Sequence, residues 1–192
     1  MMGAQILHFL VDTVCGFFTV ALLARFVLQN ARAPFRNPLG QFIMAVTDWM
    51  VLPARRYIPG FRGYDTATLM LALGWQFINM SVATAVTIFG IGLGPTLLLG
   101  LLLLALLETI KVSLYLVMAV VLISAIFSWV NPHAPMAGLF NRISQPWLRP
   151  FQRLIPPVGG VDLSPLALIV LVQVGLMLLA GTRFAVLPLL IG

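Results

Sequence analysis

Four apolar segments, each long enough to cross a lipid bilayer, constrain this chain more than any other feature. They occupy residues 6–29, 66–94, 96–130 and 165–190. About 20 apolar residues in a helix cross a hydrocarbon core of roughly 30 Å. Within lipid the backbone polar groups must bond to one another, and a helix satisfies them inside a single segment. We therefore predict an all-α membrane protein with four transmembrane helices.

The composition supports this prediction. Of the 192 residues, 61% are hydrophobic and only 8% are charged, whereas a soluble domain carries about 25% charged residues. This chain has too few polar groups to cover the surface of a globular protein in water. We therefore expect lipid to be its solvent. The N-terminus has neither a positively charged region nor a small-residue cleavage site, and we expect the first apolar segment to remain as an anchor.

The stretch 128–166 has a counterpart 97 residues earlier in the chain, without a gap. A run of Pro-x-x-Arg-x-Ile-Pro followed by Gly-x-Asp is shared at this one offset. We interpret the chain as two tandem repeats, 1–95 and 96–192, each a hairpin of two spans joined by a basic loop. The identical pairs are Pro38/Pro135, Pro53/Pro150, Arg56/Arg153, Ile58/Ile155, Pro59/Pro156 and Asp65/Asp162.

Each basic loop contains apolar residues at helical spacing. In the first loop Gly40–Leu52 has this pattern, and Pro53 would limit the helix. In the second, Pro146 and Pro150 would divide the apolar stripe into short pieces, with Ser144 capping one of them. We predict short amphipathic helices in the membrane plane. Their interface anchors would be Trp49 and Trp147, and their lipid or partner contacts Arg55, Arg56, Arg149 and Arg153.

An aspartate precedes the second span of each repeat. Asp65 and Asp162 are equivalent, as are Arg56 and Arg153, so we expect these charges to pair within or across the repeats and to fix the loops. Lipid contact by the arginines is the second interpretation, and substrate binding the third. Asp162 would also lie at or beside the N-cap of the last span.

Several polar residues interrupt the spans. Gln76, Asn79 and Ser81 are candidates for hydrogen bonds between helices. Glu108 and Lys111 are three residues apart and can pair on one helix face. Arg25 and Arg183 would extend to the headgroups. Alternatively, some polar groups line a wet path for a solute, since charges at depth are usually functional. The candidates for such a path are Asp12, Gln76, Glu108 and Lys111.

The segment 96–130 is too long for a single perpendicular span. Its 35 residues would make about 52 Å of helix. It is either one long tilted helix or a separate interfacial piece over 95–107 followed by a span. Aligning the repeats favours the second arrangement, with the span starting near Glu108.

The positive charge lies mainly in the two loops, which contain eight of the 11 Lys and Arg residues. The positive-inside rule predicts that both loops are cytoplasmic and both termini face outward. The net charge of +6 therefore indicates membrane topology and anionic lipid rather than nucleic acid.

Enzyme chemistry is not indicated. His8 and His133 fall on opposite sides under this topology, and the chain has one cysteine and no CxxCH, GxGxxG or Walker pattern. We expect no catalytic, cofactor or metal site.

The motifs SWVNP and QPWLRPFQRLIPPVGGVDLSP resemble the signature of the YggT family of small integral membrane proteins. The first-repeat segment NPLGQFIMAVTDWMVLPARRYIPGFRGYDTA is similar to that family's degenerate N-terminal repeat. The resemblance implies links to osmotic or potassium homeostasis, to cell division and, in chloroplasts, to haem attachment on a cytochrome b.

Two functions follow as hypotheses. The first is a non-enzymatic accessory factor whose cytoplasmic loops engage lipid headgroups and partner proteins during assembly or organisation of membrane complexes. The second is an oligomeric channel or transport protein in osmotic or potassium balance. Because four spans bury few faces, we expect a homo-oligomer or a subunit of a larger membrane complex.

Overall fold

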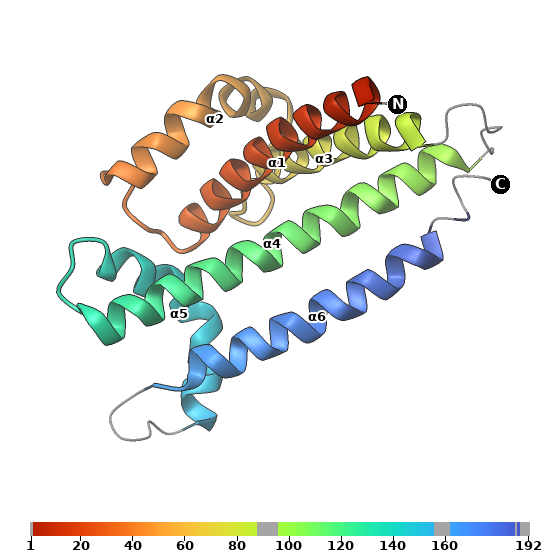
Figure 1. Ribbon diagram of the computed structural model, residues 1–192. Coiled ribbons are helices and arrows are strands. Elements are labelled where there is room, and N and C mark those ends of the chain that lie inside the picture. The colour runs from red at the N-terminus through yellow and green to blue at the C-terminus, as the bar shows by residue number, and fades with distance from the viewer. Residues whose placement is uncertain (1, 88–95, 156–161, 187, 189–192) are drawn as a thin grey trace.

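The computed structural model describes residues 2–87, 96–155, 162–186 and 188. Apart from one isolated antiparallel bridge between Phe61 and Tyr64, its regular structure is helical. Figure 1 shows the helices in chain order. They are α1 (Met2–Asn30), α2 (Pro38–Tyr57), α3 (Thr66–Thr87), α4 (Leu97–Val130), α5 (Ala137–Leu154) and α6 (Ser164–Val186).

Four of these helices, α1, α3, α4 and α6, are long and apolar enough to cross a membrane. They pack in the order α1–α3–α4–α6, and α1 also touches α4. Figure 1 shows α1 beginning and α6 ending at the same end of the molecule. The opposite end, which carries segments 31–37 and 131–136, is called the loop side below. The two remaining helices, α2 and α5, are called the loop helices.

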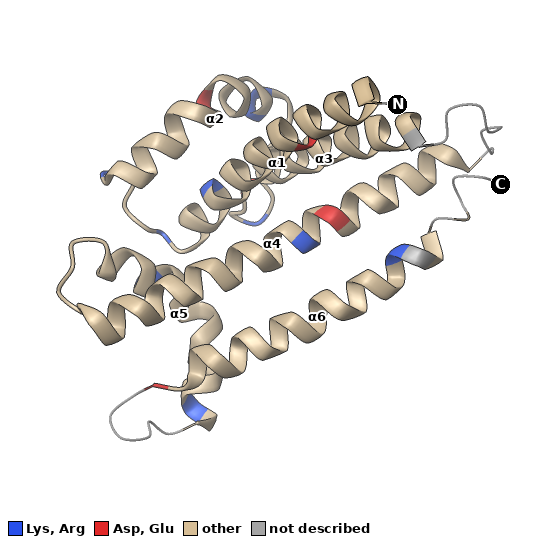
Figure 2. Cartoon of the chain, in the orientation of Figure 1, with Lys and Arg blue, Asp and Glu red and all other residues tan. Residues whose placement is uncertain are grey.

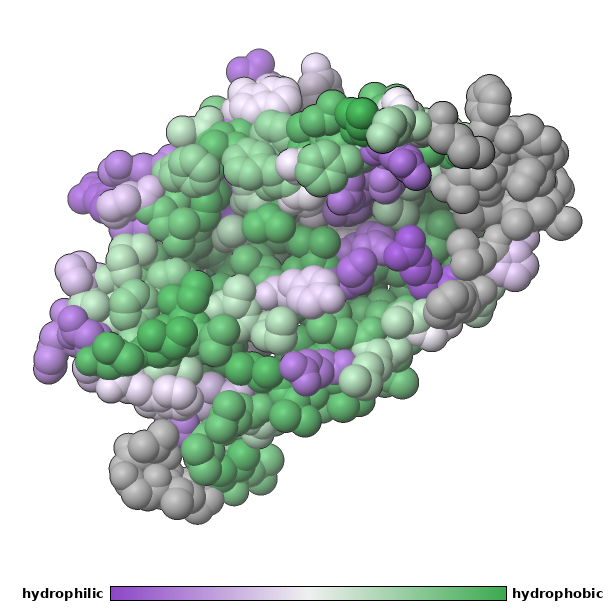
Figure 3. All heavy atoms as spheres, viewed as in Figure 1, coloured by the Kyte–Doolittle hydropathy of each residue, from purple (hydrophilic) through white to green (hydrophobic). Residues whose placement is uncertain are grey.

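Each loop helix packs against the two spanning-length helices that it connects, α2 against α1 and α3, and α5 against α4 and α6. An apolar cluster then joins the halves: Leu28 of α1 and Ile43 of α2 meet Val120 of α4 and Ile143 of α5. Elsewhere large apolar side chains face outward, as the green surface of Figure 3 shows. Such a surface is typical of a protein whose solvent is lipid.

The long apolar segment forms one helix, so the preferred separate piece over 95–107 is wrong. Helix α4 runs for 34 residues without interruption. Its first turns have partners of their own, because Leu101, Leu104 and Ala105 are buried against Met80 of α3. Burial of these side chains stabilises the first turns of α4, so the helix continues beyond the length that a single bilayer crossing needs. Three glycines and a proline within 90–95 predict a turn between the halves, and this segment lies outside the described residues.

The prolines do not divide the loop helices as expected. Pro53 lies inside α2, and Pro146 and Pro150 lie inside α5. A proline removes one helical hydrogen bond and strains the preceding turn, but the apolar face of each helix is buried well enough to outweigh that cost. Ser144 is accordingly no cap. It lies within α5, fully buried, and its hydroxyl donates to Ser124 Oγ at 3.0 Å.

Candidate functional site

The loop side contains an aspartate held by an arginine. Arg55, in the last turn of α2, donates to Asp65 Oδ2 from Nη2 at 2.5 Å and from Nε at 3.2 Å. The Thr68 hydroxyl donates to the same oxygen. Partial burial acts to raise the pKa of Asp65, but the bonds from Arg55 and Thr68 outweigh it and hold the pKa below its usual range. The charged pair fixes the end of α2 to the start of α3.

The second half uses an uncharged donor at the same place. Gln152, 97 residues after Arg55, donates to Asp162 Oδ2 at 2.8 Å. The backbone N–H of Ser164 donates to Asp162 Oδ1 at 2.8 Å, so the aspartate caps the start of α6 as expected. Partial burial acts to raise the pKa of Asp162. The hydrogen bonds from Ser164 and Gln152 together outweigh this effect and hold the pKa below its usual range. Asp162 is therefore ionised at neutral pH.

These contacts correct the expected pairing of Arg56 with Asp65 and of Arg153 with Asp162. The residues that bind the aspartates, Arg55 and Gln152, each precede the expected arginine by one position. Adjacent residues on a helix point about 100° apart, so only one of each pair can face its aspartate. Arg56 and Arg153 are exposed instead.

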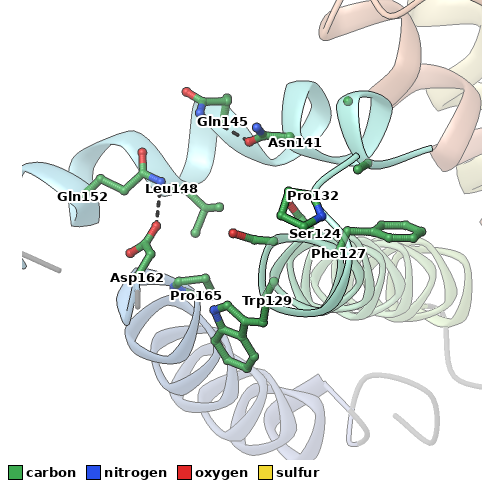
Figure 4. A pocket seen from close by; sticks show the side chains of 14 residues that line it. Ser124, Phe127, Trp129, Pro132, Asn141, Gln145, Leu148, Gln152, Asp162 and Pro165 are labelled. Atoms are coloured by element: carbon green, nitrogen blue, oxygen red, sulfur yellow. Dashed lines mark hydrogen bonds between the residues drawn. The ribbon is translucent and has the colours of Figure 1, made fainter. Parts of the chain in front are cut away.

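A polar cavity of about 270 Å³ lies between the loop-side ends of α4 and α6 and one face of α5. Figure 4 shows Asn141, Gln145 and Gln152 of α5 along one wall, with Ser124 of α4 and Asp162 across from them. We call it the Asp162 cavity. Among the described residues that line it there is one carboxylate and no lysine or arginine. The remaining lining residues are Ala125, Phe127, Ser128, Trp129, Pro132, Ala137, Gly138, Leu148 and Pro165.

Around the adjacent face of α5 lies a basic cleft of about 330 Å³, which shares Gln145 with the cavity. It is lined by Arg32, which follows α1, and by Arg142 and Arg149 of α5. Arg149 Nε donates to Gln145 Oε1 at 3.1 Å. Figure 2 shows most of the basic residues gathered toward this end of the molecule. We call it the arginine cleft. Of its three arginines, the sequence interpretation singled out only Arg149; a seven-residue spacing along α5 could have indicated Arg142.

The two expected tryptophan anchors differ in their surroundings. Trp49 of α2 is 61% exposed, and its indole N–H is satisfied by the Val46 carbonyl. Its ring meets the edge of Phe18 on α1. Trp147 is partly buried and packs against the clusters that join α5 to α4. Of these two tryptophans, only Trp49 presents a large exposed aromatic surface.

Arg25 is no snorkelling residue. It is 4% exposed, and Nη1 donates to the Thr47 hydroxyl at 2.7 Å and to Asp48 Oδ1 at 2.6 Å. The guanidinium therefore points into α2 instead of toward headgroups. The sequence could not have predicted this pair, because Asp48 follows Arg25 by 23 residues and no spacing rule connects them.

The polar residues within the spans form two separate groups. Between α1 and α3, Asn79 donates to Asp12 at 2.9 Å and Gln76 donates to Thr19 at 3.3 Å. These are the interhelical bonds expected of Gln76 and Asn79. Ser81 instead donates to the Phe77 carbonyl of its own helix.

The second group ties α6 to α4. Glu108 binds Lys111 at 2.7 Å, as the spacing predicted, and also binds Arg183 of α6 at 2.8 Å. Arg183 is thus an ion-pair partner and not a free interface residue. The described hydrogen bonds join these four residues in two groups, Asp12 and Gln76 between α1 and α3, and Glu108 and Lys111 beside α6. Within the described ranges no group of three or more His, Cys, Asp or Glu could hold a metal ion.

The fold defines the class as an all-helical protein with four helices suited to crossing a membrane, consistent with a multi-pass membrane protein. The chain belongs to the CCB3/YggT family, whose family model matches residues 4–86 and 103–183.

Relatives cover most of the chain. The protein named YggT of Escherichia coli K12 is 38% identical over 169 residues, which are 88% of this chain and 86% of the relative. The uncharacterized protein PA0392 of Pseudomonas aeruginosa is 37% identical over 160 residues, 82% of this chain and 80% of the relative. A Vibrio alginolyticus protein, described by its position in the proC 3′ region, is 34% identical over 168 residues, 87% of this chain and 89% of the relative. No solved structure matches.

Proposed function

We propose that this protein is a non-enzymatic accessory factor of a bacterial inner membrane. Its two loop helices lie on the cytoplasmic leaflet, where they engage lipid headgroups and partner proteins and help to assemble or organise membrane complexes. The halves 1–95 and 96–192 are two repeats of one unit. The observation that carries the proposal is the arginine cleft, because three guanidinium groups around one hollow suit a phosphate.

The surroundings of the cleft support a membrane-surface role. Arg56 and Arg153 add exposed positive charge on the same side, and Arg55 keeps part of its side chain exposed. Exposed Phe42, Trp49 and Leu52 give α2 an apolar outer face. A helix with such a face beside clustered arginines matches the pattern of interfacial helices that bind anionic lipid.

A helix partner is the second part of the proposal. Among the described residues, helix α6 packs mainly on α4 and α5, and Gln173 is exposed midway along α6. An amide facing hydrocarbon without a hydrogen bond is costly. A second copy or another membrane subunit packed there would satisfy it, in keeping with a homo-oligomer or a larger complex.

Neutralising the cleft should remove bound anionic lipid. We expect the double variant Arg142→Gln plus Arg149→Gln, purified in native lipid, to retain roughly a tenth or less of the phosphatidylglycerol and cardiolipin that the parent chain retains, because two of three phosphate contacts are lost. Native mass spectrometry counts the retained lipids.

The matched control is Arg36→Gln plus Arg62→Gln, which removes the same charge from exposed loop-side positions outside the cleft. It should keep most of the lipid. Equal losses in the two double variants would show that net charge alone attracts lipid and would contradict a role for the cleft.

A further inference from the structure

We propose that the Asp162 cavity binds the guanidinium group of an arginine side chain presented by a partner protein. The cavity and the arginine cleft lie on adjacent faces of α5, and Gln145 is the one described residue that lines both. The assignment to a partner rests on the proposed function, whereas binding of the guanidinium group does not.

The internal comparison of the two halves carries the proposal. In the first half Arg55 gives Asp65 a cation, and the Thr68 hydroxyl adds a second bond. At the same offset the second half has Gln152 in place of Arg55 and Pro165 in place of Thr68. Asp162 therefore occupies the equivalent position as a carboxylate without the charged partner that Asp65 has.

The carboxylate of Asp162 is left with unused acceptor capacity. The described contacts supply it with one amide N–H and one backbone N–H, whereas a carboxylate can accept about four hydrogen bonds. None of the ion pairs among the described residues includes Asp162, although the chain carries a net charge of +6. Because the ionised Asp162 carboxylate borders the cavity and has no counter-charge among the described residues, it favours binding of a cation in the cavity.

The shape and lining of the cavity suit an arginine in particular. About 270 Å³ accommodates a planar guanidinium with part of its stem. Ser124, Gln145 and Gln152 offer further oxygen acceptors for its N–H groups. Leu148, Phe127 and Pro132 provide apolar surface for the methylene chain (Figure 4). A planar guanidinium can direct two N–H groups at one carboxylate, as Arg55 Nε and Nη2 do toward Oδ2 of Asp65, and this fork favours guanidinium over an ammonium group.

The test is a titration of the full chain in lipid nanodiscs. The probe is N-acetyl-arginine amide, whose only charge is the guanidinium, and the matched probe is N-acetyl-citrulline amide, which has the same shape without charge. We expect the arginine probe to bind roughly tenfold or more tightly than the citrulline probe by calorimetry, because only the former forms a charge-assisted pair.

Two variants locate the binding. Asp162→Asn keeps an oxygen for the Ser164 N–H but removes the charge, and it should weaken binding of the arginine probe roughly tenfold or more. Gln152→Arg copies the first half and places the chain's own guanidinium on Asp162. It should also abolish binding while leaving the melting temperature unchanged or higher, which separates occupation of the site from loss of fold.

The proposal is overturned if the arginine and citrulline probes bind the parent chain equally, if neither binds, or if Asp162→Asn binds as well as the parent. It is equally overturned if N-acetyl-lysine amide or ethanolamine binds as tightly as the arginine probe, since guanidinium would then not be the recognised group. Lipid retention by the arginine cleft is measured separately, so failure here leaves the proposed lipid role standing and the reverse also holds.

Discussion

Asp48→Ala should lower the free energy of unfolding by about 2–4 kcal/mol, because it leaves a buried guanidinium without its counter-charge. Arg25 is only 4% exposed, whereas the Asp48 side chain is 41% exposed. The aspartate can return to water when its partner is lost, but Arg25 cannot. Equilibrium unfolding in mixed detergent micelles measures the change.

The reverse substitution is the control. Arg25→Leu leaves only the accessible Asp48 unpaired and should cost less than Asp48→Ala. Leucine and glutamine occupy the equivalent places in the second half, as Leu122 and Gln145. The double variant Arg25→Leu plus Asp48→Gln should therefore be more stable than Asp48→Ala. Finding Arg25→Leu to be the most damaging of the three would contradict a buried, neutralised arginine.

Glu108→Gln should also lower the free energy of unfolding by about 2–4 kcal/mol, because Lys111 and Arg183 lie on membrane-suited helices, where a cation without its anion faces lipid and not water. Glu108 is 8% exposed and binds both Lys111 and Arg183. The second bond joins α4 to α6, which has few other neighbours. Thermal unfolding of the variant in nanodiscs, followed by intrinsic fluorescence, measures the loss.

Removing the cations first should abolish most of this cost. In a background of Lys111→Met plus Arg183→Met, Glu108→Gln removes a carboxylate that has no cation to neutralise, and the added loss should be small. Similar losses in the parent and in this background would mean that Glu108 acts through packing and not through charge.

Contacts set by local spacing could be predicted from the sequence. Glu108 and Lys111 pair because residues three apart share a helix face. Asp162 caps α6 because an aspartate before a helix start accepts a free backbone N–H. The four membrane-suited helices follow from apolar runs of sufficient length.

Contacts between distant segments could not be predicted. Arg25 meets Asp48, and Arg183 meets Glu108, only because helices pack side by side in three dimensions. Pro53 and Pro146 stay inside helices because burial of the surrounding face outweighs one lost bond. The choice of Arg55 over Arg56 depends on the rotation of α2, which spacing alone does not fix.

Accessibility of single cysteines in intact cells tests the placement of both loop helices on the cytoplasmic leaflet. The native Cys15 is buried and can be replaced by serine. We then introduce one cysteine at a time, at Arg62, at His133 or, as an outward-facing control, at Gly3. A membrane-impermeant maleimide should label Gly3→Cys in intact cells, and Arg62→Cys and His133→Cys only after the membrane is opened. Labelling of either loop variant in intact cells would contradict the account.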